Sequence, residues 1–259
     1  MLLQTVPARQ GLQWALLGMR TFWKQPLAMS GLFFLFMALV SLVSMVPVIG
    51  GALALVLMPA FTAGLMAATQ IASEGRFPMP GTLWMALRPG PRRVPMLQLG
   101  ALYAAGFLLM MAASMLVDGG QFAGVYLAGE PIRPELVQAD SFQAALWISM
   151  LLYAPLSMLF WHAPALVFWQ SVSPAKSLFF SWMGCWRNKG AFLVYIAVWA
   201  AVFGSAAVLS MLAAAMLGEP QLTLSIMMPL ALLVAAMFFT SMLFTVKDCF
   251  SATDASTAP

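Results

Sequence analysis

The chain has 259 residues, of which 63% are hydrophobic and only 8% are charged. Soluble domains average roughly 45–50% apolar and about 25% charged residues, so a water-soluble globule of this composition lacks the charge to cover its surface. The net charge of +4 comes from Lys and Arg scattered through short loops, which argues against a nucleic-acid-binding domain. The composition therefore predicts an integral membrane protein.

Before the first apolar run, residues 8–24 have the pattern of an amphipathic helix. Arg9, Gln13, Arg20 and Lys24 share one face of this helix, while apolar residues take the other face and Trp14 does not fit this division. Such a helix lies in the headgroup region of a membrane with its apolar face buried and its cations near phosphates. We expect this interfacial helix on the cytoplasmic side.

Six apolar runs are long enough to cross a hydrocarbon core of about 30 Å, which takes roughly 20 residues. They are apolar on all sides, which predicts helices and not the alternating strands of a barrel. We expect an all-α protein with a single transmembrane domain over residues 1–259 and spans at about 27–46, 48–72, 94–117, 142–170, 190–217 and 222–246. Pro47 marks a tight turn after the first span and residues 218–220 mark one after the fifth, so the spans form three hairpins.

Two further segments repeat the pattern of residues 8–24. An amphipathic helix is predicted at residues 174–188 before the fifth span, and a shorter one at residues 82–88 before the third span. The chain is thus expected to contain three copies of one unit, each with an interfacial helix, an outward span and a return span. Gly100 with Ala104 and Ser210 with Ala214 provide small faces through which spans approach one another closely.

The charged residues predict the orientation of the spans. Of the 12 Lys and Arg, all except Arg133 fall on one side of a six-span threading. The opposite side carries five acidic residues, which are Asp118, Glu130, Glu135, Asp140 and Glu219. Cationic loops remain in the cytoplasm, so we expect both termini to be cytoplasmic.

His162 is the only histidine and the only ionisable side chain in a predicted span. An ionisable group at membrane depth indicates a proton relay or a ligand site. Counting about 20 residues inward from Phe142, however, puts His162 near the inner interface, where a neutral imidazole next to Trp161 has an ordinary structural role beside a bend at Pro164. Both interpretations stay open, and His162, Trp161 and Pro164 are the candidate functional residues.

The sequence offers no other sign of catalysis. It has no phosphate loop, serine elbow or metal motif, and Glu74 beside Arg76 has the character of a solvated pair. The methionine clusters lack a Cys or His neighbour, so packing explains them better than Cu(I) binding. Cys185 and Cys249 are too few for a structural zinc site and are expected to stay reduced in the cytoplasm. We predict no catalytic, cofactor-binding or metal-ligating residue and no cofactor.

Four segments carry a resemblance to a known family, and they are residues 23–28, 59–66, 160–169 and 173–181. In these segments the chain resembles a family of uncharacterised six-span inner-membrane proteins of beta-proteobacteria, known as hypothetical transmembrane proteins. The resemblance covers most of the chain, and the segment from Trp161 to Leu166 is its most specific part. It implies a multi-pass protein of the bacterial inner membrane and adds no catalytic residue.

We therefore expect a non-enzymatic inner-membrane protein that acts as a scaffold or accessory subunit. Its expected partners are membrane lipids, together with other inner-membrane proteins or a second copy of the chain, and no nucleic acid. The alternative is a transporter or lipid-handling protein with a cavity between hairpins, lined near Pro155, His162 and Pro164. An enzyme ranks third.

Overall fold

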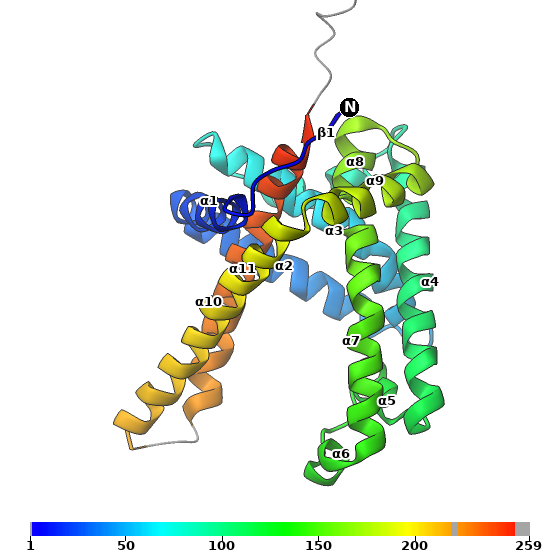
Figure 1. The fold of residues 1–259 in the computed structure, drawn as a ribbon, viewed down its shortest axis with the longest axis vertical. Coiled ribbons are helices and arrows are strands. Elements are labelled where there is room, and N and C mark those ends of the chain that lie inside the picture. The colour runs from blue at the N-terminus through cyan, green and yellow to red at the C-terminus, as the bar shows by residue number, and fades with distance from the viewer. Residues whose placement is uncertain (1, 219–221, 252–259) are drawn as a thin grey trace, which may run out of the picture. The chain divides into compact units, whose positions relative to one another are not determined.

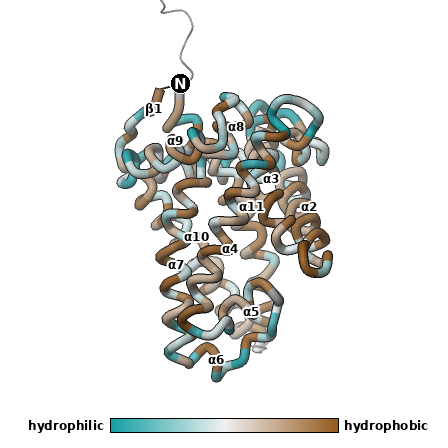
Figure 2. Tube along the Cα trace, turned by 90° about the vertical axis from the view of Figure 1, so that its right-hand side faces the viewer, coloured by the Kyte–Doolittle hydropathy of each residue, from teal (hydrophilic) through white to brown (hydrophobic). Residues whose placement is uncertain are grey.

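The computed structural model describes residues 2–218 and 222–251 (Figure 1). Six helical segments of the described residues are long and apolar enough to cross a membrane. They are α2 (Pro26–Ser44), α3 (Gly50–Ser73), α4 (Arg93–Asp118), α7 (Asp140–Phe160) with α8 (Ala163–Gln170), α10 (Lys189–Met216) and α11 (Leu222–Cys249). Figure 2 shows hydrophobic stretches along these helices and hydrophilic ones near their ends. The predicted all-α fold with six spans is confirmed.

The remaining elements connect or flank these helices. α1 (Gln10–Lys24) precedes α2, α9 (Pro174–Arg187) precedes α10, and the short α5 (Gln121–Ala128) and α6 (Pro134–Gln138) lie between α4 and α7. Strands β1 (Leu2–Leu3) and β2 (Phe250–Ser251) pair antiparallel. The segment expected to form a short helix before the third span consists of two 3-10 turns, Pro80–Thr82 and Met85–Leu87, because the prolines and glycine around it interrupt a longer helix.

The described chain divides into two compact units. Unit 1 comprises Met1–Met37, Phe61–Met85 and Met183–Pro259, and unit 2 comprises Ala38–Ala60 and Ala86–Trp182. The single transmembrane domain expected from the sequence stays a prediction. Of the turn predicted between the last two spans, Glu219 and Pro220 lie outside the described residues.

Aromatic rings fill the core of unit 1. Neighbouring ring centroids lie 5.2–6.1 Å apart along a continuous series, which is Trp84, Phe61, Phe36, Phe239, Phe238, Tyr195 and Trp14. Tilted and edge-on pairs at these distances attract one another beyond the effect of area burial. The series links α1, α2, α3, α10 and α11, and α10 and α11 lie side by side (Figure 1).

In unit 2, α4 packs along α7 (Figure 1). Near the end of α4, a buried cluster joins Met110 and Met111 to Phe122, Phe142 and Ala145. Nearer the beginning of α4, a Cβ atom on Gly100 would overlap the carbonyl oxygen of Val56, so the two backbones touch there. Gly100 and Ala104 are both buried, as the predicted small face requires.

A tight turn joins α2 to α3. The backbone of Gly50 lies against the carbonyls of Val43 and Ser44, where any larger residue would overlap them. Val48 at the tip has a positive φ of 69°, an unusual conformation for a β-branched residue, and is fully exposed. The turn that the sequence predicts around Pro47 is therefore present, and the packing of α2 along α3 as a hairpin stays a prediction.

Candidate functional site

The chain breaks between α7 and α8, at the candidate residues. α7 runs through Pro155 without interruption but ends at Phe160, and α8 begins at Ala163. Pro164 explains the position of this break, because its ring would clash with the carbonyl of the residue four positions earlier, Phe160, in a continuous helix. The predicted span at residues 142–170 is thus two helices, with the bend beside Pro164 that the sequence indicates.

Ser181 of α9 bridges this break. The backbone N–H of His162 donates to Ser181 Oγ at 2.9 Å, and Ser181 Oγ donates to the carbonyl oxygen of Met158 at 2.7 Å. One hydroxyl thereby satisfies both a donor and an acceptor near the break. Sequence reasoning missed Ser181, because it lies 19 residues from His162 and no motif connects the two. The sequence signal that could have indicated Ser181 is a serine on the helix that comes after a proline bend.

The three candidates lie together at this break, and two of them are buried. His162 has no exposed surface, and Pro164 is buried in α8 with every residue from Ala163 to Phe168. Trp161 is half-buried. Because water does not reach His162, the imidazole has no direct exchange of protons with solvent in this conformation.

One pocket of unit 2, here called the Arg92 pocket, lies where α4 begins and α8 gives way to α9. Its volume is about 290 Å³. Its polar wall consists of Arg92, Gln98, Ser171 and Ser173, and its apolar wall of Pro91, Pro95, Val167, Val172 and Pro174. The Arg92 guanidinium carbon lies 5.3 Å from the centre of the Phe168 ring, a cation–π distance.

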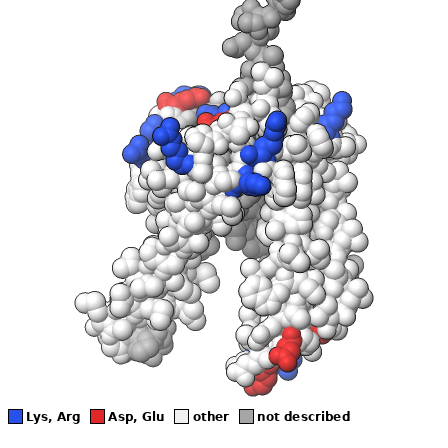
Figure 3. Space-filling view, viewed as in Figure 1, with Lys and Arg blue, Asp and Glu red and all other residues white. Residues whose placement is uncertain are grey.

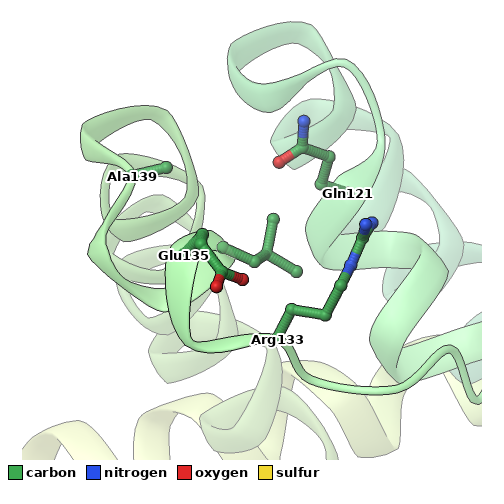
Figure 4. Close-up of a pocket in the computed structure, with 5 residues that line it drawn as sticks. Gln121, Arg133, Glu135 and Ala139 are labelled. Carbon is green, nitrogen blue, oxygen red and sulfur yellow. The ribbon is translucent and has the colours of Figure 1, made fainter.

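A second pocket of unit 2, here called the Arg133 pocket, lies in the connection between α4 and α7, with a volume of about 280 Å³. Arg133 and Gln121 lie on one side of it and Glu135 on the other (Figure 4). Neither pocket has His162, Trp161 or Pro164 in its wall. These two pockets are therefore separate from the candidates that the sequence suggests.

A partly buried polar cluster in unit 1 attaches α1 to α11. The Asp248 carboxylate accepts hydrogen bonds from Trp14 Nε1 at 2.7 Å and from Gln10 Nε2 at 2.6 Å. Trp14 is fully buried, although the helical wheel treated it as an exception, so the packed face of α1 includes it. No sequence pattern indicates this pairing, because Trp14 and Asp248 lie 234 residues apart in the sequence.

Asn188 ties the start of the chain to the same region. Its side chain accepts from the backbone N–H of Val6 at 2.8 Å and donates to the carbonyl oxygen of Gln4 at 3.0 Å. Cys185 is buried nearby in α9, and this burial raises the pKa of its thiol well above the usual value, so the thiol stays protonated. A protonated, buried thiol is a poor nucleophile and a poor metal ligand.

A probable inner membrane protein of Burkholderia thailandensis is 39% identical to this chain over 254 residues, which cover 95% of this chain and 92% of the relative. The chain belongs to the family of this protein. Together with the six apolar helices, the relative makes the chain a multi-pass inner-membrane protein, and the resemblance to beta-proteobacterial inner-membrane proteins is confirmed. No family model matches the chain, and no solved structure matches it.

Proposed function

We propose that this inner-membrane protein is a non-enzymatic scaffold or accessory subunit with both termini in the cytoplasm. The observation that best supports this proposal is the burial of His162, the ionisable side chain that the sequence places in a predicted span. It is fully buried beside a break where Ser181 bonds both the His162 N–H and the Met158 carbonyl, and neither described pocket has it in its wall. This arrangement favours a structural role for His162 over a relay.

The outward face of α7 supports a role in lateral contacts. Trp147, Met150 and Leu151 lie at spacings of three and four residues, which place them on one helix face, and Trp147 and Leu151 are 66% and 73% exposed. Apolar faces of this kind pack against lipid chains or against another membrane protein. We propose that this face contacts other inner-membrane proteins or a second copy of the chain.

Photo-crosslinking in intact membranes tests whether the exposed face of α7 contacts another protein. A photoreactive amino acid at Leu151 should give a protein adduct of defined mass, while the same group at the buried Ala145, on the packed side of α7, should give only intramolecular products. The proposal is contradicted when Leu151 yields lipid adducts alone at every expression level tested.

Solute flux distinguishes the alternative, a transporter or lipid-handling protein. In proteoliposomes, the variant His162→Ala should lower the thermal stability and leave any flux unchanged under the scaffold proposal. Loss of a measurable flux with an unchanged melting temperature would instead establish His162 as part of a transport path.

Reporter fusions test the proposed orientation. A periplasm-active reporter inserted beside Arg133 should be active, and the same reporter inserted beside Arg88 should be inactive, because the two segments flank α4. Equal activity at both positions would overturn the threading.

A further inference from the structure

The Arg92 pocket has a location and a wall that suit a lipid headgroup. It lies at the ends of the apolar helices α4 and α8, where the hydrophobic part of each gives way to a loop. A cavity needs only roughly 10–15 Å³ to hold one water molecule, so about 290 Å³ admits a group of many atoms. The wall has both polar and apolar residues, which suits a ligand with a charged headgroup and an apolar tail.

Arg92 is the cation of this pocket, and its guanidinium contacts a ring of α8. Its guanidinium lies over the ring of Phe168, which is almost fully buried and therefore fixed. A cation–π contact uses none of the guanidinium N–H groups as a hydrogen-bond donor to an oxygen, so these donors suit a ligand in the pocket. A planar guanidinium with several donors matches the oxygens of a phosphate group.

The charge around the pocket favours an anion. Residues 86–117 and 141–182 contain Arg88, Arg92, Arg93 and Lys176 but no Asp or Glu. The acidic residues of unit 2 begin at Asp118, the last residue of α4, about 39 Å from Arg92 for a helix that rises 1.5 Å per residue. Figure 3 shows acidic side chains at the lower right, with a basic one beside them, and several basic side chains higher on the same view.

Two helices also begin at the pocket. Arg92 precedes the first residue of α4, and Ser173 precedes the first residue of α9. The N-terminal end of a helix carries a partial positive charge and backbone N–H groups without helical partners, which strengthens an anion site already supplied with an arginine. Ser171 and Ser173 add hydroxyl donors.

We propose that the Arg92 pocket binds the phosphate group of an anionic phospholipid. Arg92 and Ser173 contact the phosphate oxygens, and the prolines and valines of the wall contact the glycerol and the first acyl carbons. The membrane-border location identifies a lipid as the source of the phosphate, whereas a soluble phosphate ion would leave the apolar wall unused.

The test uses the full-length protein in nanodiscs and compares two neighbouring arginines. Native mass spectrometry measures how much phosphatidylglycerol the protein retains from mixtures with phosphatidylcholine. The variant Arg92→Gln should lower retention about tenfold, the effect of losing one charge-assisted contact. The control Arg93→Gln changes the net charge equally but is absent from the pocket wall, so it should change retention less than about twofold.

Further measurements distinguish a bound lipid from a bound phosphate ion and from a loss of folding. Arg92→Lys keeps the charge and should retain an intermediate amount, and the helical content of each variant, measured by circular dichroism, should equal that of the parent. Excess inorganic phosphate should not displace the lipid. Arg92-dependent binding of inorganic phosphate without a lipid preference would overturn the assignment to a lipid, and equal retention by Arg92→Gln and Arg93→Gln would overturn the site itself.

Discussion

Helices α1 and α9 have similar amphipathic patterns in the sequence, but the protein uses them differently. α1 is packed by its backbone, since a Cβ atom on Gly11 would overlap the carbonyl oxygen of Ala191 and one on Gly18 would overlap the side chain of Ser241. α9 contributes one hydroxyl, that of Ser181, to the break between α7 and α8. α1 is therefore part of the core of unit 1, whereas α9 supplies hydrogen bonds to backbone groups at the break between α7 and α8.

The comparison shows that a pattern of apolar and polar residues does not decide what a helix packs against. The glycines of α1 permit contact between backbones, and a contact of this kind has no space for a side chain. Ser181 makes directional hydrogen bonds, which a single atom supplies and a single substitution removes. We therefore expect larger losses of stability from changes in α1 than from changes in α9.

The largest effect should come from Gly18→Val. The new side chain would collide with the backbone and side chain of Ser241, so the free energy of unfolding should fall by about 3 kcal/mol or more. Thermal unfolding of the purified protein in detergent measures this loss. Gly31→Ala in α2 is the control, because nothing lies within 4 Å of its Cβ position, and it should stabilise the protein by about 0.5–1 kcal/mol. Equal melting temperatures for the two variants would refute the close packing of α1 against α11.

Asp248→Ala should have the next largest effect. It leaves the buried Trp14 indole N–H without its acceptor, at an expected cost of about 2–3 kcal/mol. Asp248→Asn keeps one acceptor oxygen and should lose less, so the two variants bracket the contribution of the charge. Chemical denaturation of both variants provides the measurement, and a smaller loss for Ala than for Asn would contradict the role assigned to the carboxylate.

Ser181→Ala should cost about 1–2 kcal/mol, because the His162 N–H and the Met158 carbonyl both lose the hydroxyl. The matched control is Ser205→Ala on α10, whose exposed hydroxyl bonds only within its own helix turn. This control should lie within about 0.5 kcal/mol of the parent protein. Identical unfolding temperatures for the two serine variants would show that Ser181 does not bridge the break.

The smallest effect concerns Glu74, just beyond the end of α3, where Lys24 of α1 donates to the carbonyl of Ser73. The hydrogen bond from Arg76 lowers the pKa of Glu74 below its usual 4.5. Stability from this pair is thus present above the pKa of the unfolded state and is lost as the pH falls through the lower pKa of the folded state. Since the pair is exposed, Glu74→Gln should leave the melting temperature at pH 7 almost unchanged. A large drop there would mean that the pair is more than a surface contact.

The spans and the bend were predictable from the sequence because each depends on local chemistry. Continuous apolar runs with few charges define the six helical segments to within a few residues. Pro164 determines where α7 ends, and the small residues Gly100 and Ala104 identify a close approach. Such features need no knowledge of distant parts of the chain.

Other features depend on contacts that no local pattern records. Trp14 did not fit the division of the helical wheel, and its hydrogen bond to Asp248 could not be foreseen because the two residues are 234 apart in the sequence. The burial of His162 depends on how α8 and α9 fold back, and Ser181 looked like one more polar residue of an interfacial helix. The Arg92 pocket was also missed, since it combines residues from the start of α4 with residues of the later connection between α8 and α9.

The attachment of α1 has a consequence for how the protein is made. The surfaces that receive this helix, Ala191 on α10 and Ser241 and Asp248 on α11, lie far downstream of α1 in the sequence and are synthesised after it. At a synthesis rate of about 5–20 residues per second, α1 waits roughly 10–40 s before its docking site exists. During that interval its apolar side lacks the partners that bury it in the folded protein. Assembly of unit 1 is therefore completed only after α11 has been translated.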